Sequence, residues 1–494
     1  MTTKVKMRLN AALAALAGIA LRLFFVLKFP STDSGDAPFY IELAWNWLKR
    51  GVYGGNVDGR LMPLDARGPG YPGFLAAVFS VAGNSQRAVM LTQVFVDLAA
   101  CFLIALIAAR LAPEAVRRRV ALAGLWLAAL CPFTANYTAV VLTETLVTFL
   151  TALAILVLLE TELGAARGVA NLRRRAFGPW FLGGVIVGFG ALVRPETPLL
   201  LLAAGLALLA KWWRPVDWLK LARAGMLMAL GLVLPLLPWA ARNWHTLHDV
   251  QFLAPRYTEF PGDFAPLGFN AWTRTWLWRY GDVYLTLWKL DTEEIPIESI
   301  PARAFDSPEE RARVADLLEP YNDSLTLSRE QDRAFGEIAA GRTARHPLRT
   351  HFTIPLLRSL ALWFTPRVEL LPYSGHLWPL WHEWKDDRQD FVVTLSLALV
   401  NCVYVALALA GAWMARRRPG WAFLVIFVLV RTLFFADFIE TPEPRYVLEC
   451  FPAALALAAQ CFAGRVSFLR QARGESSAAR SAGSAPSRGF PAGL

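Results

Sequence analysis

The sequence carries little charge for its length. Of its 494 residues only 18% are charged, whereas 55% are hydrophobic. A soluble globular chain carries about a quarter charged residues to cover its surface. The low charge therefore excludes an ordinary soluble or disordered protein. Long apolar runs that recur between residues 9 and 464 instead indicate a polytopic membrane protein.

Several motifs are also missing. There is no Walker A sequence and no HExxH, and the five cysteines lie in apolar runs without a CxxC pair. We therefore expect neither a disulfide nor a cysteine-bound metal. His376, His382 and Glu383 stand in an aromatic loop, where we interpret them as loop or interface residues rather than metal ligands. Gly184 and Gly188 have the spacing of a helix-packing face, not of a dinucleotide loop.

The net charge of +11 would suggest nucleic acid in a soluble chain. Here the basic clusters lie in short loops between apolar runs, where they orient the chain in a membrane, so we expect no nucleic-acid partner. With both termini in the cytoplasm, ten spans place every basic cluster inside. These spans are 9–29, 88–110, 120–138, 139–159, 179–194, 197–213, 224–241, 391–414, 421–438 and 446–464.

The predicted fold is all-α, with about ten transmembrane helices. Segment 352–364 is apolar but short and contains Arg358, so we interpret it as an interfacial helix; an eleventh span would place the basic cluster at 416–418 outside. Ser307 and Ser328 resemble N-caps and predict soluble helices outside the membrane. The chain divides into a transmembrane module 1–241 with a first outer loop 30–86, a mainly helical outer segment 242–390, transmembrane helices 391–464, and a disordered cytoplasmic tail 465–494.

The first outer loop contains an amphipathic segment. A helix is expected over 37–50, lying flat in the membrane interface. Glu42, Asn46 and Lys49 fall on one stripe, which we expect to face water.

Three charged residues of this loop are candidates for chemistry. Asp36 precedes the helix, where it could be an N-cap worth about 1 kcal/mol, a catalytic carboxylate, or both. Asp33 is a loop acid or a second carboxylate. Arg67 stands before a proline-rich return to the membrane and fits equally well a phosphate ligand or an arginine reaching the headgroups.

Other charges interrupt the apolar runs. Ionisable groups inside a membrane are costly and usually face a cavity or a partner. We interpret Asp97, Glu196 and Arg431 as members of structural ion pairs. A belt of charges at the predicted outer face favours a polar cavity for an anionic lipid headgroup, and it comprises Glu144, Arg194, Glu196, Arg242, Glu443 and Arg445.

In its ordered set of motifs the sequence resembles the GT-C superfamily of membrane glycosyltransferases, in the branch of protein O-mannosyltransferases and lipid A aminoarabinose transferases. The motifs cover nearly the whole chain. They are GDAPFYIELAWNWLKRGVY (35–53), RGPGYP (67–72), LTETL (142–146), LVRPE (192–196), PWAARNW (238–244), His346-Pro347 and PRY (444–446).

The resemblance implies an inverting transfer of a sugar from a polyprenyl-phosphate donor, at the outer face of a plasma membrane that is the bacterial inner membrane. The acceptor stays open among lipid, glycan and protein. A transporter or flippase of lipid-linked sugars is the alternative, although no repeated halves are visible. The implied residues are Asp36 as catalytic carboxylate; Asp33 and Glu144 as candidate second acids; Arg67, Arg194, Arg242 and Arg445 for the donor phosphate; and Tyr40, Tyr71, Glu443 and Tyr446 in the pocket.

Family members often place a second acid directly after the catalytic one, where this chain has Ala37. Arginines alone can stabilise a departing phosphate. We therefore expect no required cofactor, with a divalent metal as the alternative.

Overall fold

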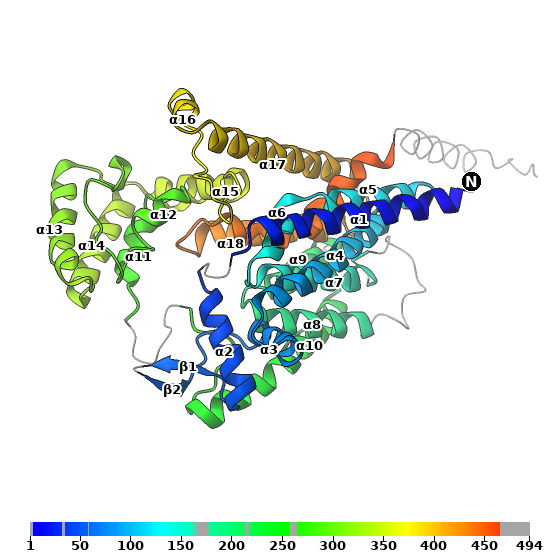
Figure 1. Cartoon of the computed structure of the whole chain (residues 1–494), viewed down its shortest axis with the longest axis horizontal. Helices are drawn as coiled ribbons and strands as arrows, with labels where there is room; N and C mark the ends of the chain where they lie inside the picture. The colour runs from blue at the N-terminus through cyan, green and yellow to red at the C-terminus, as the bar shows by residue number, and fades with distance from the viewer. Residues whose placement is uncertain are drawn as a thin grey trace, which may run out of the picture.

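The computed structural model describes residues 3–31, 35–57, 59–161, 163–164, 177–212, 217–256 and 264–464. These residues are mostly helical, and their one sheet is a two-stranded hairpin. The all-α prediction is therefore confirmed for them. Long helices run side by side through the centre of Figure 1, and a group of shorter helices lies beyond the end opposite the N-terminus.

The central helices coincide with the predicted spans. By length and composition, five stretches in the described part could cross a membrane, and a sixth if a bent pair counts as one. Ten spans are therefore not confirmed. The long stretches are α1 (Thr3–Lys28), α4 (Gln86–Leu111), α10 (Trp218–Leu247), α17 (Arg388–Ala415) and Pro444–Ala463, which contains α19 (Phe451–Ala458); shorter apolar helices are α7 (Glu144–Leu159), α8 (Phe177–Val193), α9 (Leu199–Lys211) and α18 (Trp421–Asp437).

The span predicted over 120–138 is broken into two helical pieces. The chain bends by 51° between Glu114–Ala129 and Pro132–Ala139. Helix α5 (Arg117–Ala129) ends there, and Pro132 opens α6 (Pro132–Ala135). Proline has no N–H for the preceding turn, so it begins a new helix rather than continuing the old one. The next span likewise becomes helical only at Glu144.

Helices α8 and α10 approach closely at the predicted glycine face. A Cβ at Gly184 would lie 2.3 Å from the carbonyl oxygen of Met228, and one at Gly188 would lie 2.5 Å from that of Leu232. Neither position has room for a side chain. The helix-packing interpretation of these glycines is confirmed.

The first outer loop folds as α2 (Ala37–Arg50), the hairpin β1 (Gly54–Val57) and β2 (Arg60–Pro63), and α3 (Gly70–Ala82). The predicted helix over 37–50 is confirmed. Its water-facing stripe is wrong for Asn46, which is buried and donates to the carbonyl oxygen of Gly54 at 2.9 Å, whereas Lys49 is exposed. Glu42 is half-buried and accepts from the Asn56 backbone at 2.8 Å. The hairpin thus covers part of the stripe, which a helical pattern alone does not reveal.

The outer segment has its own hydrophobic core, in which Trp272 and Phe335 pack with ring centroids 5.2 Å apart. Both predicted caps are confirmed. Ser307 Oγ accepts from Glu310 N at 3.2 Å, and Ser328 forms a capping box with Gln331. The helices are α11 (Leu267–Arg274), α12 (Gly281–Leu285), α13 (Pro308–Ser324), α14 (Arg329–Arg345), α15 (Ile354–Phe364) and α16 (Leu380–Asp386).

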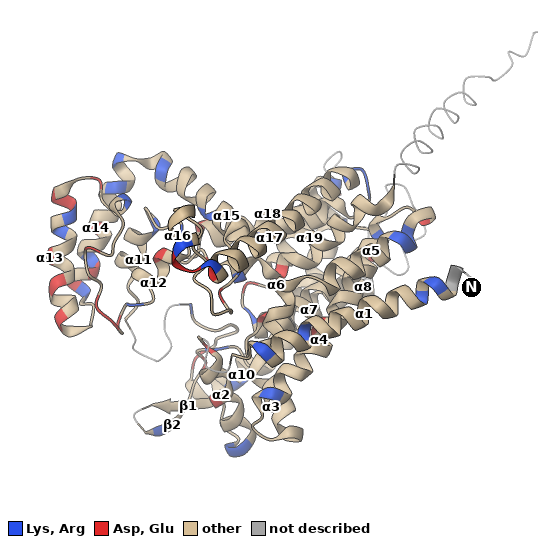
Figure 2. Cartoon of the chain, turned by 45° about the horizontal axis from the view of Figure 1, so that its top comes forward, with Lys and Arg blue, Asp and Glu red and all other residues tan. Residues whose placement is uncertain are grey.

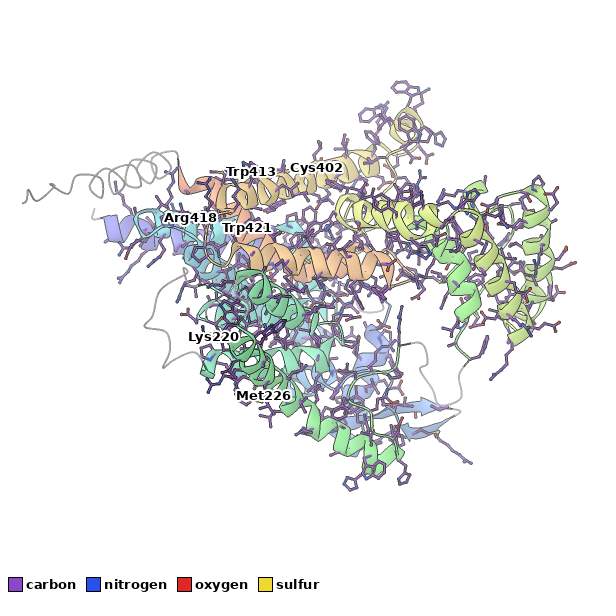
Figure 3. All side chains as sticks on the ribbon, turned by 180° about the vertical axis from the view of Figure 1, so that it is seen from behind. Lys220, Met226, Cys402, Trp413, Arg418 and Trp421 are labelled. Atoms are coloured by element: carbon purple, nitrogen blue, oxygen red, sulfur yellow. The ribbon has the colours of Figure 1, made fainter. Side chains whose placement is uncertain are left out.

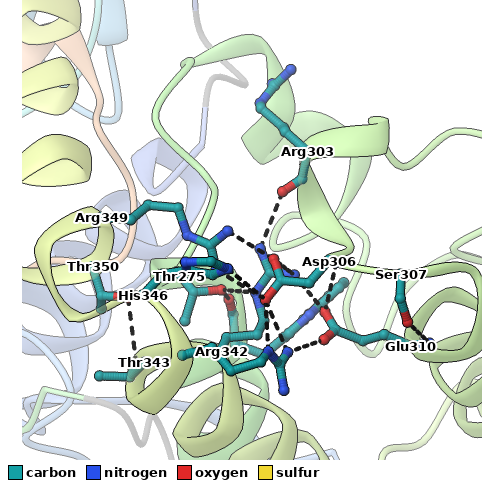
Figure 4. Close-up of polar contacts among 12 residues, drawn as sticks. Thr275, Arg303, Asp306, Ser307, Glu310, Arg342, Thr343, His346, Arg349 and Thr350 are labelled. Atoms are coloured by element: carbon teal, nitrogen blue, oxygen red, sulfur yellow. Dashed lines mark hydrogen bonds and ion pairs between the residues drawn. The ribbon is translucent and has the colours of Figure 1, made fainter.

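An arginine cluster around Asp306 holds these helices together (Figure 4). Arg345 and Arg349 donate to its carboxylate at 2.9 and 2.7 Å, and Arg342 lies 3.2 Å away. Burial opposes ionisation of Asp306, but the hydrogen bonds from Arg349 and Arg345 prevail and lower its pKa to about 2. The cluster joins the start of α13 to the end of α14 and to a π-helical turn, Arg349–Thr353.

The π-helical turn leads directly into α15, which confirms a helix within 352–364. Its place at a membrane interface stays a prediction. Arg358 does not face solvent; its side chain is buried and donates to the carbonyl oxygens of Leu277 and Ile439.

Charged residues gather at the two ends of the long helices (Figure 2). Lys and Arg mark the N-terminal end of α1 and the start of α5. Figure 3 places Lys220, Arg418, Trp413 and Trp421 toward that same end. This grouping agrees with the predicted basic loops, whereas the side of the membrane stays a prediction. The tail 465–494 lies outside the described residues.

Candidate active site

A cavity of about 760 Å³ lies where the first outer loop, the N-terminus of α7, the C-termini of α8 and α18, and the outer segment meet. These elements are far apart in sequence. Seven of the residues predicted for the site line it: Asp36, Tyr40, Arg67, Glu144, Arg194, Arg445 and Tyr446.

Asp36 occupies the N-cap position of α2, but its side chain makes no capping hydrogen bond. Its Oδ1 instead accepts from Arg67 Nη2 at 3.0 Å. The backbone N–H of Ser31 donates to the carbonyl oxygen of Ala139 at 2.9 Å and ties the start of the loop to the segment before α7. The capping interpretation of Asp36 is therefore wrong, and its carboxylate is turned toward the cavity.

The charges around Asp36 determine its ionisation. Burial would raise the pKa of Asp36, but Arg67, Arg445 and Arg194 together outweigh burial and lower the pKa below its ordinary value. Asp36 is therefore an ionised hydrogen-bond acceptor at neutral pH.

Arg67 is positioned by glycines and a tyrosine. A Cβ at Gly68 would lie 2.3 Å from the carbonyl oxygen of Leu192, so the loop meets the end of α8 backbone to backbone. Tyr53 donates its hydroxyl to the Arg67 carbonyl oxygen at 2.8 Å. The guanidinium lies 5.6 Å from the ring centre of Phe39. The RGPGYP motif thus places Arg67 next to the end of α8, where Gly68 and Gly70 pack against Leu192 and Val193.

Arg194 and Arg445 share the carboxylate of Glu144. Arg194 Nη1 lies 3.2 Å and Arg445 Nη1 lies 3.9 Å from Glu144 Oε1. Arg445 Nε also donates to Glu443 at 2.5 Å, and Tyr446 donates to Glu443 at 2.8 Å. Both guanidinium groups lie 5.7 Å from the ring centre of Tyr446.

The arginines and their acids differ in exposure. The side chains of Arg67 and Arg445 are 23% and 24% exposed, whereas those of Glu144 and Glu443 are buried behind the arginines. Buried carboxylates therefore orient the guanidinium groups, and the arginines form part of the accessible wall. Such a wall suits an oxyanion because a guanidinium can bind phosphate through two parallel hydrogen bonds.

Four predicted residues are not brought into the cavity. Asp33 lies outside the described residues. Arg242 donates instead to the backbone carbonyls of Leu64, at 2.8 Å, and Tyr53. Tyr71 packs under Tyr40 and donates to Gln93 at 2.8 Å. Glu443 does not line the cavity, but its carboxylate accepts hydrogen bonds from Arg445 and Tyr446, which do.

The sequence patterns missed several residues in or near the cavity. Glu449 does not line the cavity, but it is buried beside Arg431 and lies 3.8 Å from Arg194, and as an acid within a predicted span it could have been found from the cost of burying charge. Arg256 and Glu440 line the cavity and form an ion pair at 3.1 Å, and Trp288 also lines it. No sequence signal distinguishes these from ordinary loop residues.

Two predicted structural ion pairs are confirmed. Asp97 accepts from Arg22 Nε at 2.7 Å, and both side chains are buried. Arg431 pairs with Glu449. Glu196 lies 3.9 Å from Arg194 but also lines the cavity, so it belongs to the wall rather than to a separate pair.

The residues present do not form a metal-binding set. No group of three His, Cys, Asp or Glu side chains among the described residues is placed to hold an ion. Asp36 is paired with Arg67, and Glu144 with Arg194 and Arg445.

Comparison with solved structures found four chains of oligosaccharyltransferases from Archaeoglobus fulgidus, the first of them named as the archaeal enzyme AglB. The complex with an inhibitory peptide and a dolichol-phosphate has a TM-score of 0.49 and 15% identity over 99% of this chain and 53% of that one. The form with a tethered acceptor peptide has a TM-score of 0.49 and 14% identity over 93% and 49%, and the apo form has 0.48 and 15% over 96% and 52%. The chain thus spans about half the length of these structures.

A comparison with curated proteins found no match. Residues 66–239 match the family model of dolichyl-phosphate-mannose-protein mannosyltransferases. This range includes Arg67, Glu144 and Arg194 and excludes Asp36 and Arg445. Over residues 66–239 the match confirms the resemblance to GT-C membrane glycosyltransferases that the sequence motifs carry.

Proposed function

We propose that this protein transfers a sugar from a polyprenyl-phosphate donor to an acceptor hydroxyl at the outer face of the membrane. The observation that supports this most is the pairing of one ionised carboxylate, Asp36, with the arginines Arg67, Arg194 and Arg445 in one cavity. The matched family model, named for a dolichyl-phosphate sugar, supports the donor class.

The donor phosphate would bind against Arg194 and Arg445. Their guanidinium groups share Glu144 and lie over Tyr446, so they are held in place before the donor arrives. When negative charge develops on a leaving group, preorganised positive charge is usually the largest single contribution to the rate enhancement. The buried acids behind the arginines limit the cost of holding them close together without substrate.

Asp36 would act at the acceptor. The acceptor oxygen attacks the anomeric carbon while its proton passes to the Asp36 carboxylate. The bond between the anomeric carbon and the phosphate oxygen breaks, and its electron pair leaves with the polyprenyl phosphate. Attack opposite the leaving group inverts the anomeric carbon. Arg67 holds Asp36 at 3.0 Å and keeps it ionised for this step.

The acceptor would enter between the first outer loop and the outer segment. The cavity lining also contains Arg256, Asn270 and Trp288, all from the segment 242–390. Asn270 and Trp288 offer an amide and an indole ring that the proposed donor side lacks, so we assign acceptor selection to this segment. The basic loops at the other end of the helices favour a cytoplasmic location for that end. The family resemblance alone implies a plasma membrane that is the bacterial inner membrane.

The test uses purified protein in lipid nanodiscs with a panel of labelled polyprenyl-phosphate sugars. Wild type should release free polyprenyl phosphate from at least one donor, and Arg445→Gln should lower the rate by about 10²–10³-fold, as expected for one lost charge-stabilising donor. Arg333→Gln is the matched control, because its side chain on α14 is 85% exposed and outside the cavity. Equal rates for wild type and Arg445→Gln would contradict the proposed phosphate site.

A further inference from the structure

A second cavity, of about 600 Å³, lies among α11, α14, the π-helical turn, α15 and the end of α18. It shares no lining residue with the active-site cavity. None of its residues carries a role in the proposed transfer. What this second cavity binds can therefore be considered independently of the proposed transfer.

One side chain in this cavity has an unmet hydrogen-bonding requirement. Arg358 is 1% exposed; its Nε donates to the Leu277 carbonyl at 2.7 Å and its Nη1 to the Ile439 carbonyl at 2.9 Å. Its Nη2 is buried and has no hydrogen-bond partner. A buried charged donor left without an acceptor loses its hydration without replacement and destabilises the fold. The cavity thus offers a guanidinium edge that an acceptor atom would satisfy.

Among the residues that line this cavity, arginines outnumber carboxylates, although Asp437 and Glu440, which lies outside the lining, are also near Arg358. Arg274 and His351 line the same cavity, and the one carboxylate is that of Asp437, whose backbone oxygen accepts from Arg274. No ion pair within 4.0 Å joins Asp437 to either arginine in the part of the chain described. Burial and the neighbouring Arg274 lower the pKa of Arg358 to about 9, which leaves it charged at neutral pH. This environment favours an anion.

The surroundings combine hydroxyl groups with an apolar surface. Thr343 and Thr350 line the wall, with their Oγ1 atoms 3.5 Å apart (Figure 4). The π-helical turn brings Thr350 and His351 to the cavity, and such turns are frequent at functional sites. Beside the lining residues of the same helix runs an exposed stripe at spacings of four, made of Phe352, Leu356, Leu360 and Phe364.

We propose that this cavity binds the phosphate group of an anionic membrane phospholipid, with the acyl chains along the α15 stripe. A free phosphate would satisfy Arg358 but would leave the stripe uncovered. A lipid phosphate satisfies both features. The proposal does not depend on the transferase activity.

The experiment places the full chain in nanodiscs of phosphatidylcholine mixed with phosphatidylglycerol and counts retained lipids by native mass spectrometry. Wild type should retain phosphatidylglycerol in preference to phosphatidylcholine. Arg274→Gln should lower that retention about tenfold, the effect of losing one charge-assisted hydrogen bond. Arg333→Gln removes the same charge from the exposed face of α14 and should retain the lipid as wild type does.

Arg358→Gln should lower retention further, and its thermal midpoint reports whether the buried substitution still folds. Arg274→Gln keeps the test valid if that variant does not. Equal retention by wild type and Arg274→Gln would overturn the proposal. Displacement of phosphatidylglycerol by inorganic phosphate would also overturn it, because the cavity would then recognise free phosphate rather than a lipid.

Discussion

Replacing Asp36 by Asn separates catalysis from stability at one position. Asp36 makes no capping hydrogen bond, so the usual loss of about 1 kcal/mol for a removed N-cap does not apply. Its ion pair with Arg67 has side chains that are 36% and 23% exposed, and such pairs contribute about 0–1 kcal/mol. The free energy of unfolding should therefore fall by less than about 1 kcal/mol. A lost general base should slow transfer by about 10²–10⁴-fold.

The assay is initial-rate release of polyprenyl phosphate in nanodiscs, paired with thermal unfolding of the same samples. Glu42→Gln is the control, since Glu42 is a carboxylate on the same helix that bonds to the hairpin rather than facing the cavity. It should leave the rate within about twofold of wild type, given the effect of an ordinary surface substitution. Near-full activity of Asp36→Asn would refute the reasoning, as would a rate loss that only follows a loss of folded protein.

Three further predictions test the site's construction. Because arginines lower the pKa of Asp36, the acid limb of kcat/KM should lie below the ordinary range of a carboxyl group, and Arg67→Gln should move it to higher pH in a pH–rate series. Gly68→Ala should destabilise by about 1–3 kcal/mol and slow transfer because its Cβ meets backbone, whereas Gly73→Ala, with its nearest atom at 3.5 Å, should do neither in paired melting and rate measurements. Arg242→Gln should lower stability by about 1–3 kcal/mol through unpaired loop carbonyls but leave the donor KM unchanged in steady-state kinetics, and a raised KM would contradict its place outside the cavity.

The sequence was sufficient for features that depend on local pattern. The apolar runs predicted where most of the long helices lie, and the capping residues Ser307 and Ser328 predicted the starts of α13 and α14. The cost of burying charge predicted that Asp97 belongs to an ion pair and that Glu144, Arg194 and Arg445 share one cavity.

Features that depend on tertiary contacts were not predictable. The hairpin that covers Asn46 is short and has no strong alternating pattern. Arg242 and Arg194 look alike in the sequence, but the first donates to loop carbonyls while the second reaches the cavity. Trp288 lines the cavity only because the outer segment folds over the helix ends, and the local sequence around Trp288 does not specify that fold.

The most direct test of the account is the stoichiometry of a single turnover. Wild-type protein in sealed vesicles would receive a donor labelled on both the sugar and the polyprenyl phosphate, together with a crude acceptor fraction. The account predicts one free polyprenyl phosphate for each sugar found on an acceptor, with inverted anomeric configuration and with both products lost in Asp36→Asn. Donor that crosses the bilayer intact, with no free polyprenyl phosphate, would contradict the transferase and favour a transporter of lipid-linked sugars.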